Sequence, residues 1–314
     1  MEDSRATKLD NNNSTNNAYI VACIPAYNEA KAIANIIQQA KKYVTEVIVY
    51  DDGSLDNTDE IAKAAGATVI KSPINKGYGV AIKTLFQAAR VKNADVMVTL
   101  DSDGQHNPDQ ILSVLEPVLK DGFDIVIGSR FLNHTDEQKV PAYRSFGIKT
   151  ITKLTQAASY NSITDAQSGF RAFSKNALLK INPFEEGMAV STEILLRAKE
   201  KNLLIKEVPV TINYDVSNPS THNPLLQGIT TLNSIIRYVS LRHPLAFYGI
   251  PGFILLAIAA GFMYSAVDLY SATRYISTNM ILVSVGAAIT GMILLATAVI
   301  LNTITALLKA KGVN

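Results

Sequence analysis

Apolar residues recur along the chain with two spacings between residue 19 and residue 212. Short runs of apolar and β-branched residues predict buried strands, and segments with apolar positions three or four apart predict helices between them. The predicted strands are Tyr19–Ile24, Val47–Tyr50, Thr68–Lys71, Val96–Leu100, Asp124–Ile127 and Ile205–Ile212. The predicted helices are Asn28–Lys41, Tyr78–Arg90, Pro108–Lys120 and Ser191–Lys201. A further helix is predicted to begin at an N-cap of Asp56 or Asn57 and to end at Ala65. Strands separated by helices indicate right-handed βαβ units and therefore an α/β domain with a mostly parallel sheet.

The pattern changes beyond Gly228. Apolar residues on one helical face, with Arg237 and Arg242 close by, predict a helix in the membrane interface, although a surface helix docked on the core has the same pattern. Two uncharged runs follow, Leu245–Val267 and Ile281–Leu301, and Asp268 and Arg274 mark a short polar connection between them. The first run is about 34 Å long as a helix, against roughly 30 Å of hydrocarbon. Two transmembrane helices are therefore predicted.

These patterns divide the chain into five parts. They are a polar, Asn-rich tail over 1–17, an α/β domain over 18–228, an interfacial helix over 229–243, a two-helix membrane domain over 244–308 with spans at about 245–267 and 279–303, and a tail over 309–314. Basic residues flank the spans on the side of the large domain, which predicts that this domain and the 309–314 tail face the cytoplasm from the cell membrane. A membrane domain of two helices leaves homo-oligomerisation open.

Composition narrows the class of protein. The chain has 314 residues, of which 48% are hydrophobic, and its net charge is only +2. Such a balance, without a basic stripe and interleaved aromatic residues, argues against a nucleic-acid partner. Because Cys23 is the single cysteine, an intramolecular disulfide is excluded. This cysteine lies in an apolar run and is expected to be a small buried residue.

Polar residues gather where the predicted strands end. They are Pro25-Ala26-Tyr27-Asn28-Glu29, Asp51-Asp52, Asp101-Ser102-Asp103 and Gly128-Ser129-Arg130. Ligands of open parallel sheets bind beyond the carboxyl ends of the strands, so these segments mark the expected site. No G-x-G-x-x-G follows the first strand and there is no P-loop, which disfavours a dehydrogenase-type fold. The segment Asn75–Gly79 is glycine-rich, so its backbone could approach a ribose or phosphate, but a plain turn accounts for it equally well.

The sequence Asp101-Ser102-Asp103-Gly104-Gln105 is the strongest candidate for chemistry. Two carboxylates at positions i and i+2 of a strand end can converge on one hard divalent cation, with Gln105 as a third oxygen donor. These ligands favour Mg²⁺ or Mn²⁺ over zinc. The alternative is an acidic turn that precedes the helix starting at Pro108, with Asn107 as its N-cap.

Together, six segments resemble the family 2 glycosyltransferases of GT-A fold, which are Rossmann-like. The segments are Ile24–Glu29, Asp51–Thr58, Asn75–Gly79, Asp101–His106, Gly128–Phe131 and Asp165–Arg171. Their order and spacing are most similar to the polyprenyl-phosphate sugar synthases, the group that includes dolichol-phosphate mannose synthases. The resemblance covers roughly residues 19 to 212, and six motifs in one order are far more specific than any single motif.

The resemblance implies metal-dependent transfer of a hexose, with inversion, from a nucleotide-diphosphate sugar to dolichyl or another polyprenyl phosphate. The nucleotide-sugar ligands it implies are Pro25, Tyr27, Glu29, Asp52, Asn75, Gly77 and Asp101, and the metal ligands are Asp101, Asp103 and Gln105. The catalytic residues it implies are Asp103, Arg130, Arg144 and Asp165, with both arginines on the acceptor phosphate. Independently, an arginine at a strand end suits bidentate phosphate binding, although Arg130 could instead form a surface ion pair.

Several alternatives remain open at this stage. Glu193 could be a helix-dipole partner or part of the site. The segment Asn213–Pro224 has none of the basic residues that mannose-type relatives carry there, so the donor could be GDP-mannose or a UDP-hexose. A membrane polysaccharide synthase of this fold typically has a Gln-x-x-Arg-Trp motif, and this chain has no tryptophan. A non-catalytic membrane-tethered nucleotide-binding scaffold would keep the fold without needing Asp101 and Asp103.

Overall fold

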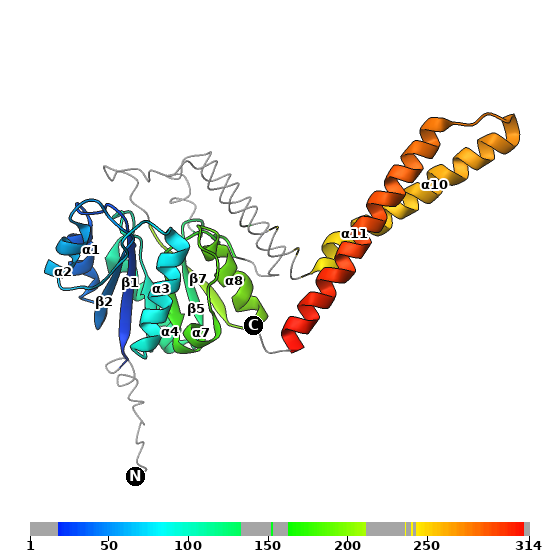
Figure 1. Ribbon diagram of the computed structural model, residues 1–314. Helices are drawn as coiled ribbons and strands as arrows, with labels where there is room; N and C mark the ends of the chain where they lie inside the picture. The colour runs from blue at the N-terminus through cyan, green and yellow to red at the C-terminus, as the bar shows by residue number, and fades with distance from the viewer. Residues whose placement is uncertain are drawn as a thin grey trace, which may run out of the picture. The chain divides into compact units, whose positions relative to one another are not determined.

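The computed structural model describes residues 18–132, 152, 163–211, 236, 240 and 243–310, excepting the side chains of 308–310. The chain divides into two compact units, Met1–Ser234 and Ile235–Asn314, which we describe separately (Figure 1). Three sequence predictions lie outside the described residues: the 1–17 tail, Arg144 and the segment Asn213–Pro224. Only residues 236 and 240 of the predicted interfacial helix are described before residue 243.

A seven-stranded sheet forms the centre of the described part of the first unit. Its order is β3-β2-β1-β4-β6-β5-β7. The strands are β1 (Ile20–Ala26), β2 (Glu46–Asp51), β3 (Thr68–Lys71), β4 (Val96–Thr99), β5 (Ile125–Ser129), β6 (Arg171–Ser174) and β7 (Ile205–Pro209). Every pairing is parallel except those of β6, which runs antiparallel to β4 and β5. The predicted α/β class with a mostly parallel sheet is therefore confirmed.

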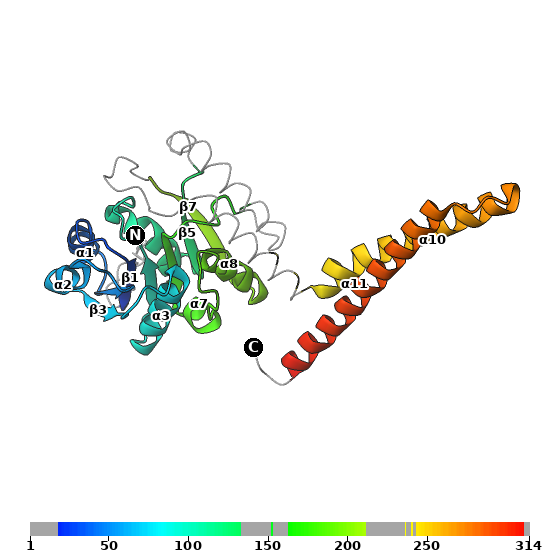
Figure 2. The ribbon, with the colours of Figure 1, turned by 45° about the horizontal axis from the view of Figure 1, so that its top comes forward.

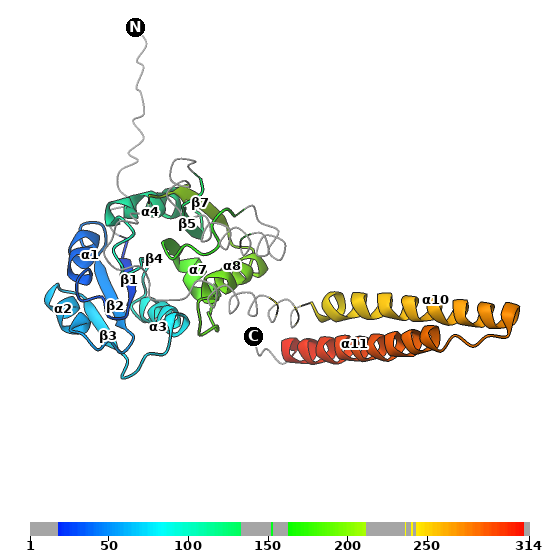
Figure 3. The same cartoon turned by 90° about the horizontal axis from the view of Figure 1, so that it is seen from above.

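Helices cover both faces of this sheet, as Figure 3 shows from above. One face packs against α3 (Tyr78–Val91), α7 (Lys175–Lys180) and α8 (Val190–Glu200). The other packs against α1 (Ile33–Ala40), α2 (Thr58–Ala64) and α4 (Ile111–Lys120), which a short 3₁₀ turn, η1 (Pro108–Gln110), precedes. Because both faces are covered, alternate residues of each strand enter two separate cores, which is why β1 reads as a continuous apolar run.

Two features of this unit differ from the sequence prediction. Helix α1 begins at Ile33 and not at Asn28, because Asn28 has a φ of +58° and residues 30–32 form a turn before the helix. The sequence prediction also missed β6 and α7. Both elements are too short to show the spacing of apolar residues that is typical of a strand or a helix, and β6 starts with the charged Arg171.

The second unit contains two long apolar helices, α10 (Ile250–Thr273) and α11 (Thr278–Ala310), after a π-helical turn, η2 (Leu245–Gly249). By length and composition, Leu245–Thr273 and Thr278–Leu307 can each cross a membrane, with mean hydropathies of 2.0 and 2.2. The predicted polar connection is wrong in one respect, since Asp268 lies inside α10. The helix ends only at Arg274, which has a φ of +59°.

The two helices lie side by side (Figure 2) and meet through small residues spaced seven apart. These are Gly252, Ala259 and Ala266 on α10 and Ser284, Gly291 and Ala298 on α11, all of them buried. A Cβ built at Gly252 would lie 3.0 Å from the Gly291 carbonyl oxygen, and one at Gly291 would lie 2.9 Å from the Gly252 carbonyl oxygen. The Ser284 hydroxyl donates to the Ala259 carbonyl at 2.7 Å. Small residues allow the two backbones to approach each other closely. Close packing is what holds such helices together, because lipid tails are as apolar as the helices and supply no hydrophobic driving force for association.

We expect Gly291→Leu to separate α10 from α11, because the new side chain has no space beside Gly252. Overpacking of this kind costs about 1 to 3 kcal/mol. Disulfide formation between Ala259→Cys and Ser284→Cys in membranes measures the separation, and its yield should fall sharply in the Gly291→Leu background. Gly286→Leu is the matched control, because a Cβ at Gly286 meets nothing within 4 Å. Equal yields in the two backgrounds would contradict the packing described here.

Candidate active site

The loop after β1 presents Tyr27 and Glu29 at the carboxyl edge of the sheet. Four hydrogen bonds connect this loop to residues 54–58: Asn28 N–H donates to Ser54 Oγ at 2.9 Å, Glu29 N–H to Thr58 Oγ1 at 2.8 Å, Ala30 N–H to Asp56 Oδ2 at 3.1 Å, and Leu55 N–H to Asn28 Oδ1 at 2.8 Å. Tyr27 is left 40% exposed. The sequence analysis missed the positioning roles of Ser54, Asp56 and Thr58, although so many small polar residues in one turn are a recognisable signal.

Asp52 holds the glycine-rich loop of Asn75–Gly79. Its buried carboxylate accepts the N–H groups of Lys76 and Gly77, each at 2.8 Å. The next glycine, Gly79, donates to the Glu186 carbonyl at 2.9 Å, and a Cβ there would lie 2.2 Å from the Glu185 carbonyl oxygen. The backbone that closely approaches Gly79 is therefore that of Glu185 and Glu186, and not a ribose or phosphate. Nucleotide binding by Asp52, Asn75 and Gly77 stays a prediction.

Glu193 supports the same loop from the other side. Its buried carboxylate accepts the N–H groups of Phe184 at 3.0 Å and Glu185 at 2.9 Å, and it pairs with Arg197 at 2.5 Å. The backbone that packs on Gly79 is therefore held by Glu193. The sequence left two roles open for Glu193, as a helix-dipole partner or as part of the site. The contacts show an additional role, which is to position the 184–186 segment.

Asp101 and Asp103 lie just after β4, from which Leu100 separates them, at the carboxyl edge of the sheet. Asp103 accepts the Gln105 N–H at 2.9 Å, and the side chain of Asp101 is 34% exposed. The Asn107 side chain accepts the Asp109 N–H at 3.0 Å where η1 begins, so the predicted N-cap is confirmed. Since the cap uses Asn107 and leaves Asp101 and Asp103 out of the helix start, the capping turn and a cation site are compatible.

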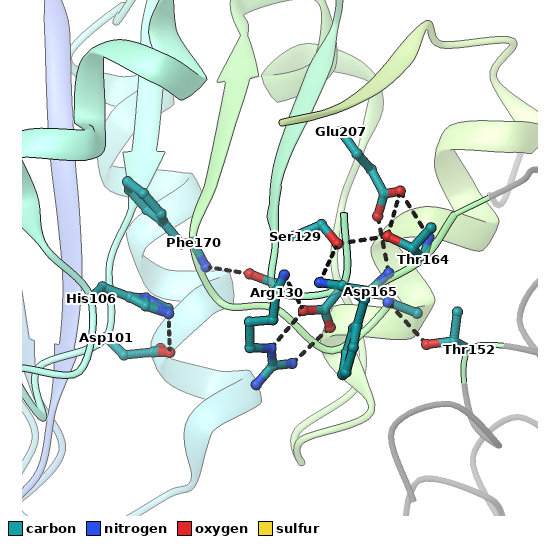
Figure 4. A network of polar contacts seen from close by, with 12 residues as sticks. Asp101, His106, Ser129, Arg130, Thr152, Thr164, Asp165, Phe170 and Glu207 are labelled. Carbon is teal, nitrogen blue, oxygen red and sulfur yellow. Dashed lines mark hydrogen bonds and ion pairs between the residues drawn. The ribbon is translucent and has the colours of Figure 1, made fainter. Parts of the chain in front are cut away.

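Two aromatic residues lie against Asp101. Burial raises the pKa of Tyr78, so its hydroxyl stays protonated and hydrogen-bonds with Asp101 and Ser191. Burial also lowers the pKa of His106 to about 4, which keeps this imidazole neutral, and its Nε2 lies 3.8 Å from Asp101 Oδ2 (Figure 4). His106 packs on the Phe170 ring with centroids 5.3 Å apart. Neither neighbour neutralises the Asp101 carboxylate.

The acidic groups at this edge lie close enough to affect one another. Burial, followed by repulsion from Asp103, Asp56 and Asp101, raises the pKa of Glu29 to about 7. Among the described residues, no three His, Cys, Asp or Glu side chains form a cage that could hold a metal by themselves. That fits Mg²⁺ or Mn²⁺, since Mg²⁺ in particular is usually held by one or two carboxylates together with substrate phosphates. Asp101, Asp103 and the Gln105 amide are a suitable donor set for this arrangement.

Arg130, which directly follows β5, forms a buried ion pair with Asp165 (Figure 4). Arg130 Nε lies 2.6 Å from Asp165 Oδ2 and an Nη lies 2.7 Å from Oδ1, a bidentate contact. Both residues are buried, at 8% and 0% exposure. Burial raises the pKa of the Asp165 carboxyl, but the pair with Arg130 outweighs this and holds the pKa below its usual value. Arg130 does form an ion pair, but the pair is buried and does not lie on the surface, as the alternative prediction had it.

Glu207 on β7 holds Asp165 in turn. Its carboxylate accepts the N–H groups of Thr164 at 2.8 Å and Asp165 at 3.0 Å, and the Thr164 hydroxyl at 2.9 Å. The Thr164 hydroxyl also contacts Ser129 Oγ at 2.6 Å. Glu207, Asp165 and Arg130 thus form a connected network in which each group fixes the next. Glu207 was not predicted from the sequence, where its only signal is an acidic residue, next to Lys206, within a predicted strand. Phosphate binding by Arg130 stays a prediction.

The sheet order and the helices on both faces of the sheet define an α/β domain of GT-A-like fold. The profile of the family described as "Glycosyl transferase family 2" matches residues 21–181. The chain belongs to this family, and it is a glycosyltransferase.

Two proteins of similar sequence and one of similar structure were compared with this chain. The UDP-N-acetylglucosamine–dolichyl-phosphate N-acetylglucosaminyltransferase of Methanococcus voltae is 35% identical over 62% of this chain and 86% of its own length. The dolichyl-phosphate hexose transferase of Haloferax volcanii is 30% identical over 67% of this chain and 90% of its own. The crystal structure of glucosyl-3-phosphoglycerate synthase from Mycobacterium tuberculosis with Mn²⁺, UDP and phosphoglyceric acid matches 71% of this chain and 79% of its own, with a TM-score of 0.56 and 20% identity. At that identity it supports the fold alone.

Proposed function

We propose that this glycosyltransferase moves a hexose from a nucleotide-diphosphate sugar, GDP-mannose or a UDP-hexose, to dolichyl or another polyprenyl phosphate at the cytoplasmic face of the membrane. The observation that carries the proposal is the presence, in one chain, of the acidic edge at Asp101 and Asp103 and of two helices long enough to span a bilayer. The activities for which the Methanococcus and Haloferax relatives are named support the same acceptor.

The reaction forms one bond and breaks one. An acceptor phosphate oxygen attacks the anomeric carbon, and the bond from that carbon to the diphosphate breaks, so the nucleoside diphosphate leaves with the electron pair. A single displacement of this kind inverts the anomeric configuration. A phosphate monoester has its second pKa near 6, so the acceptor is largely a dianion at neutral pH and needs little help from a general base. The residues of the site therefore serve mainly to bring two anions together.

Most of the predicted residues have a place in this scheme. Asp101, Asp103 and Gln105 would hold Mg²⁺ or Mn²⁺, which when bound offsets the charge that develops on the departing diphosphate. Tyr27 and Glu29, on the loop fixed by residues 54–58, would hold the nucleoside together with Pro25. Arg130 and Arg144 would orient the acceptor phosphate. Asp165 keeps the guanidinium of Arg130 in one orientation, so that little has to rearrange when the acceptor arrives.

The test is sugar transfer to lipid. Membranes containing the full chain are incubated with radiolabelled GDP-mannose, UDP-glucose or UDP-N-acetylglucosamine, and chloroform-extractable label is counted. We expect label in the organic phase with at least one donor, increased by added dolichyl phosphate, and lost in EDTA. Label that enters only a water-soluble polymer would favour a polysaccharide synthase instead. No label with any donor, while the protein still binds a nucleoside diphosphate, would favour a non-catalytic scaffold.

The proposed topology gives a separate prediction. Basic residues on both outer flanks of the two spans predict that the large domain and residues 309–314 lie on the cytoplasmic side. A cysteine at Ser271, near the end of α10, should then face the opposite side. In inside-out vesicles from a Cys23→Ala background, Ser271→Cys should resist an impermeant maleimide until detergent is added. Labelling without detergent would contradict this orientation.

A further inference from the structure

The side chain of Asp101 lies directly over Gly169, in the segment that precedes β6. A Cβ built at Gly169 would lie 2.5 Å from Asp101 Oδ1, 2.6 Å from Oδ2 and 2.9 Å from Cγ. These are the three nearest heavy atoms, and all belong to Asp101. Real Cβ atoms do not approach other atoms so closely, so no side chain at position 169 is compatible with this position of the carboxylate.

The backbone does not require glycine at this position. Among the described residues, the glycines with positive φ are Gly53, Gly66, Gly77, Gly104 and Gly122, and Gly169 is not among them. An alanine could adopt the Gly169 backbone conformation without the strain that a positive φ imposes. What position 169 supplies is therefore space for the Asp101 carboxylate.

The backbone around Gly169 is also held in place, so it cannot retreat from a new side chain. The Thr99 hydroxyl donates to the Gly169 carbonyl at 2.7 Å, and Gly128 N–H donates to the Phe170 carbonyl at 2.9 Å. The buried Arg171 guanidinium donates to the Ala166 carbonyl at 2.7 Å and to the Ser191 carbonyl at 2.8 Å. The Asp101 side chain, by contrast, is one-third exposed and can rotate toward solvent.

We infer that Gly169 is a positioning residue, which keeps the Asp101 carboxylate in the orientation that receives the divalent cation and the diphosphate. The inference rests on the proposed metal role of Asp101. It assigns Gly169 a function that acts only through Asp101: a side chain at 169 displaces the carboxylate while the rest of the edge is unchanged. A displacement of about 1 Å at a reacting centre can cost on the order of 100-fold in rate.

The test measures binding as well as turnover. UDP and GDP are titrated into full-length protein in detergent by calorimetry, with Mn²⁺ and then with EDTA. We expect the wild type to bind one of them more tightly with Mn²⁺. Gly169→Ala should lose that manganese-dependent gain, keep the affinity measured in EDTA, and lower sugar transfer by about 100-fold. Gly187→Ala is the matched control, because Gly187 has no positive φ and a Cβ there meets nothing within 4 Å.

A thermal double-mutant cycle guards against a simple folding defect. Gly169→Ala should lower the unfolding temperature of the wild type but not that of Asp101→Ala, in which the clashing atoms are gone. Equal destabilisation in both backgrounds would overturn the inference, as would an unchanged manganese-dependent gain in Gly169→Ala. A wild type whose nucleotide affinity and transfer do not depend on Mn²⁺ or Mg²⁺ would overturn the metal assignment and the inference with it, which is a distinguishable result.

Discussion

Asp101→Asn and Asp103→Asn are each expected to lower sugar transfer by at least about 1000-fold while the protein stays folded. A hard divalent cation prefers charged oxygen ligands, and an amide in place of a carboxylate removes the charge while keeping the size. Loss of several kcal/mol of charge stabilisation at the departing diphosphate corresponds to a rate loss of this order. Radiolabel in the organic phase measures transfer, and thermal unfolding in detergent measures the fold.

Two observations make this a test of the metal and not of the loop. Asp103 also accepts the Gln105 N–H, and an asparagine oxygen can still accept that hydrogen bond, so the turn should survive Asp103→Asn. Asp109→Asn is the matched control, because Asp109 lies on the same loop but contacts Tyr43 through its carboxylate. EDTA should inactivate the wild type, and added Mn²⁺ or Mg²⁺ should restore it. Turnover near that of the wild type in either variant would refute the assignment.

The sequence predicted six of the seven strands of the sheet and most of the helices that pack on it, because both faces of the sheet are covered. Buried parallel strands read as apolar runs, and the helices between them carry one apolar stripe, as in α3. The early start predicted for α1 was wrong because Asn28 and Glu29 are bound by Ser54 and Thr58, which are distant in sequence. No pattern within residues 28–41 themselves records such a contact.

The same reasoning explains which parts of the site were predictable. Asp101 and Asp103 stand out because they interrupt an apolar run at a strand end. Glu207 and Gly169 do not, since their roles depend on residues more than 40 positions away, such as Asp165 and Asp101 respectively. The meaning of Arg130 also depends on folding. At a strand end it resembles a phosphate ligand, and only the structure shows that both carboxylate oxygens of Asp165 contact its guanidinium.

Asp165→Asn is expected to destabilise the catalytic unit strongly. It leaves the buried guanidinium of Arg130 without its charge partner, and breaking a buried pair in this way costs about 3 to 5 kcal/mol. For a domain of this size, 3 kcal/mol corresponds to a fall in unfolding temperature of roughly 6 to 12 °C. Glu116→Gln is the control, since it breaks an exposed pair with Lys120, and it should change the unfolding temperature little.

Removing both charges separates stability from function. Arg130→Met with Asp165→Leu fills a similar volume without buried charge, so it should recover most of the stability that Asp165→Asn loses. If Arg130 binds the acceptor phosphate, this stable double variant should still bind the nucleoside diphosphate but transfer sugar at least tens-fold more slowly, with the loss in acceptor use. Transfer at the wild-type rate would make the pair purely structural. The acceptor phosphate would then depend on other cations of the chain, of which Arg144 is the one that the family resemblance implies.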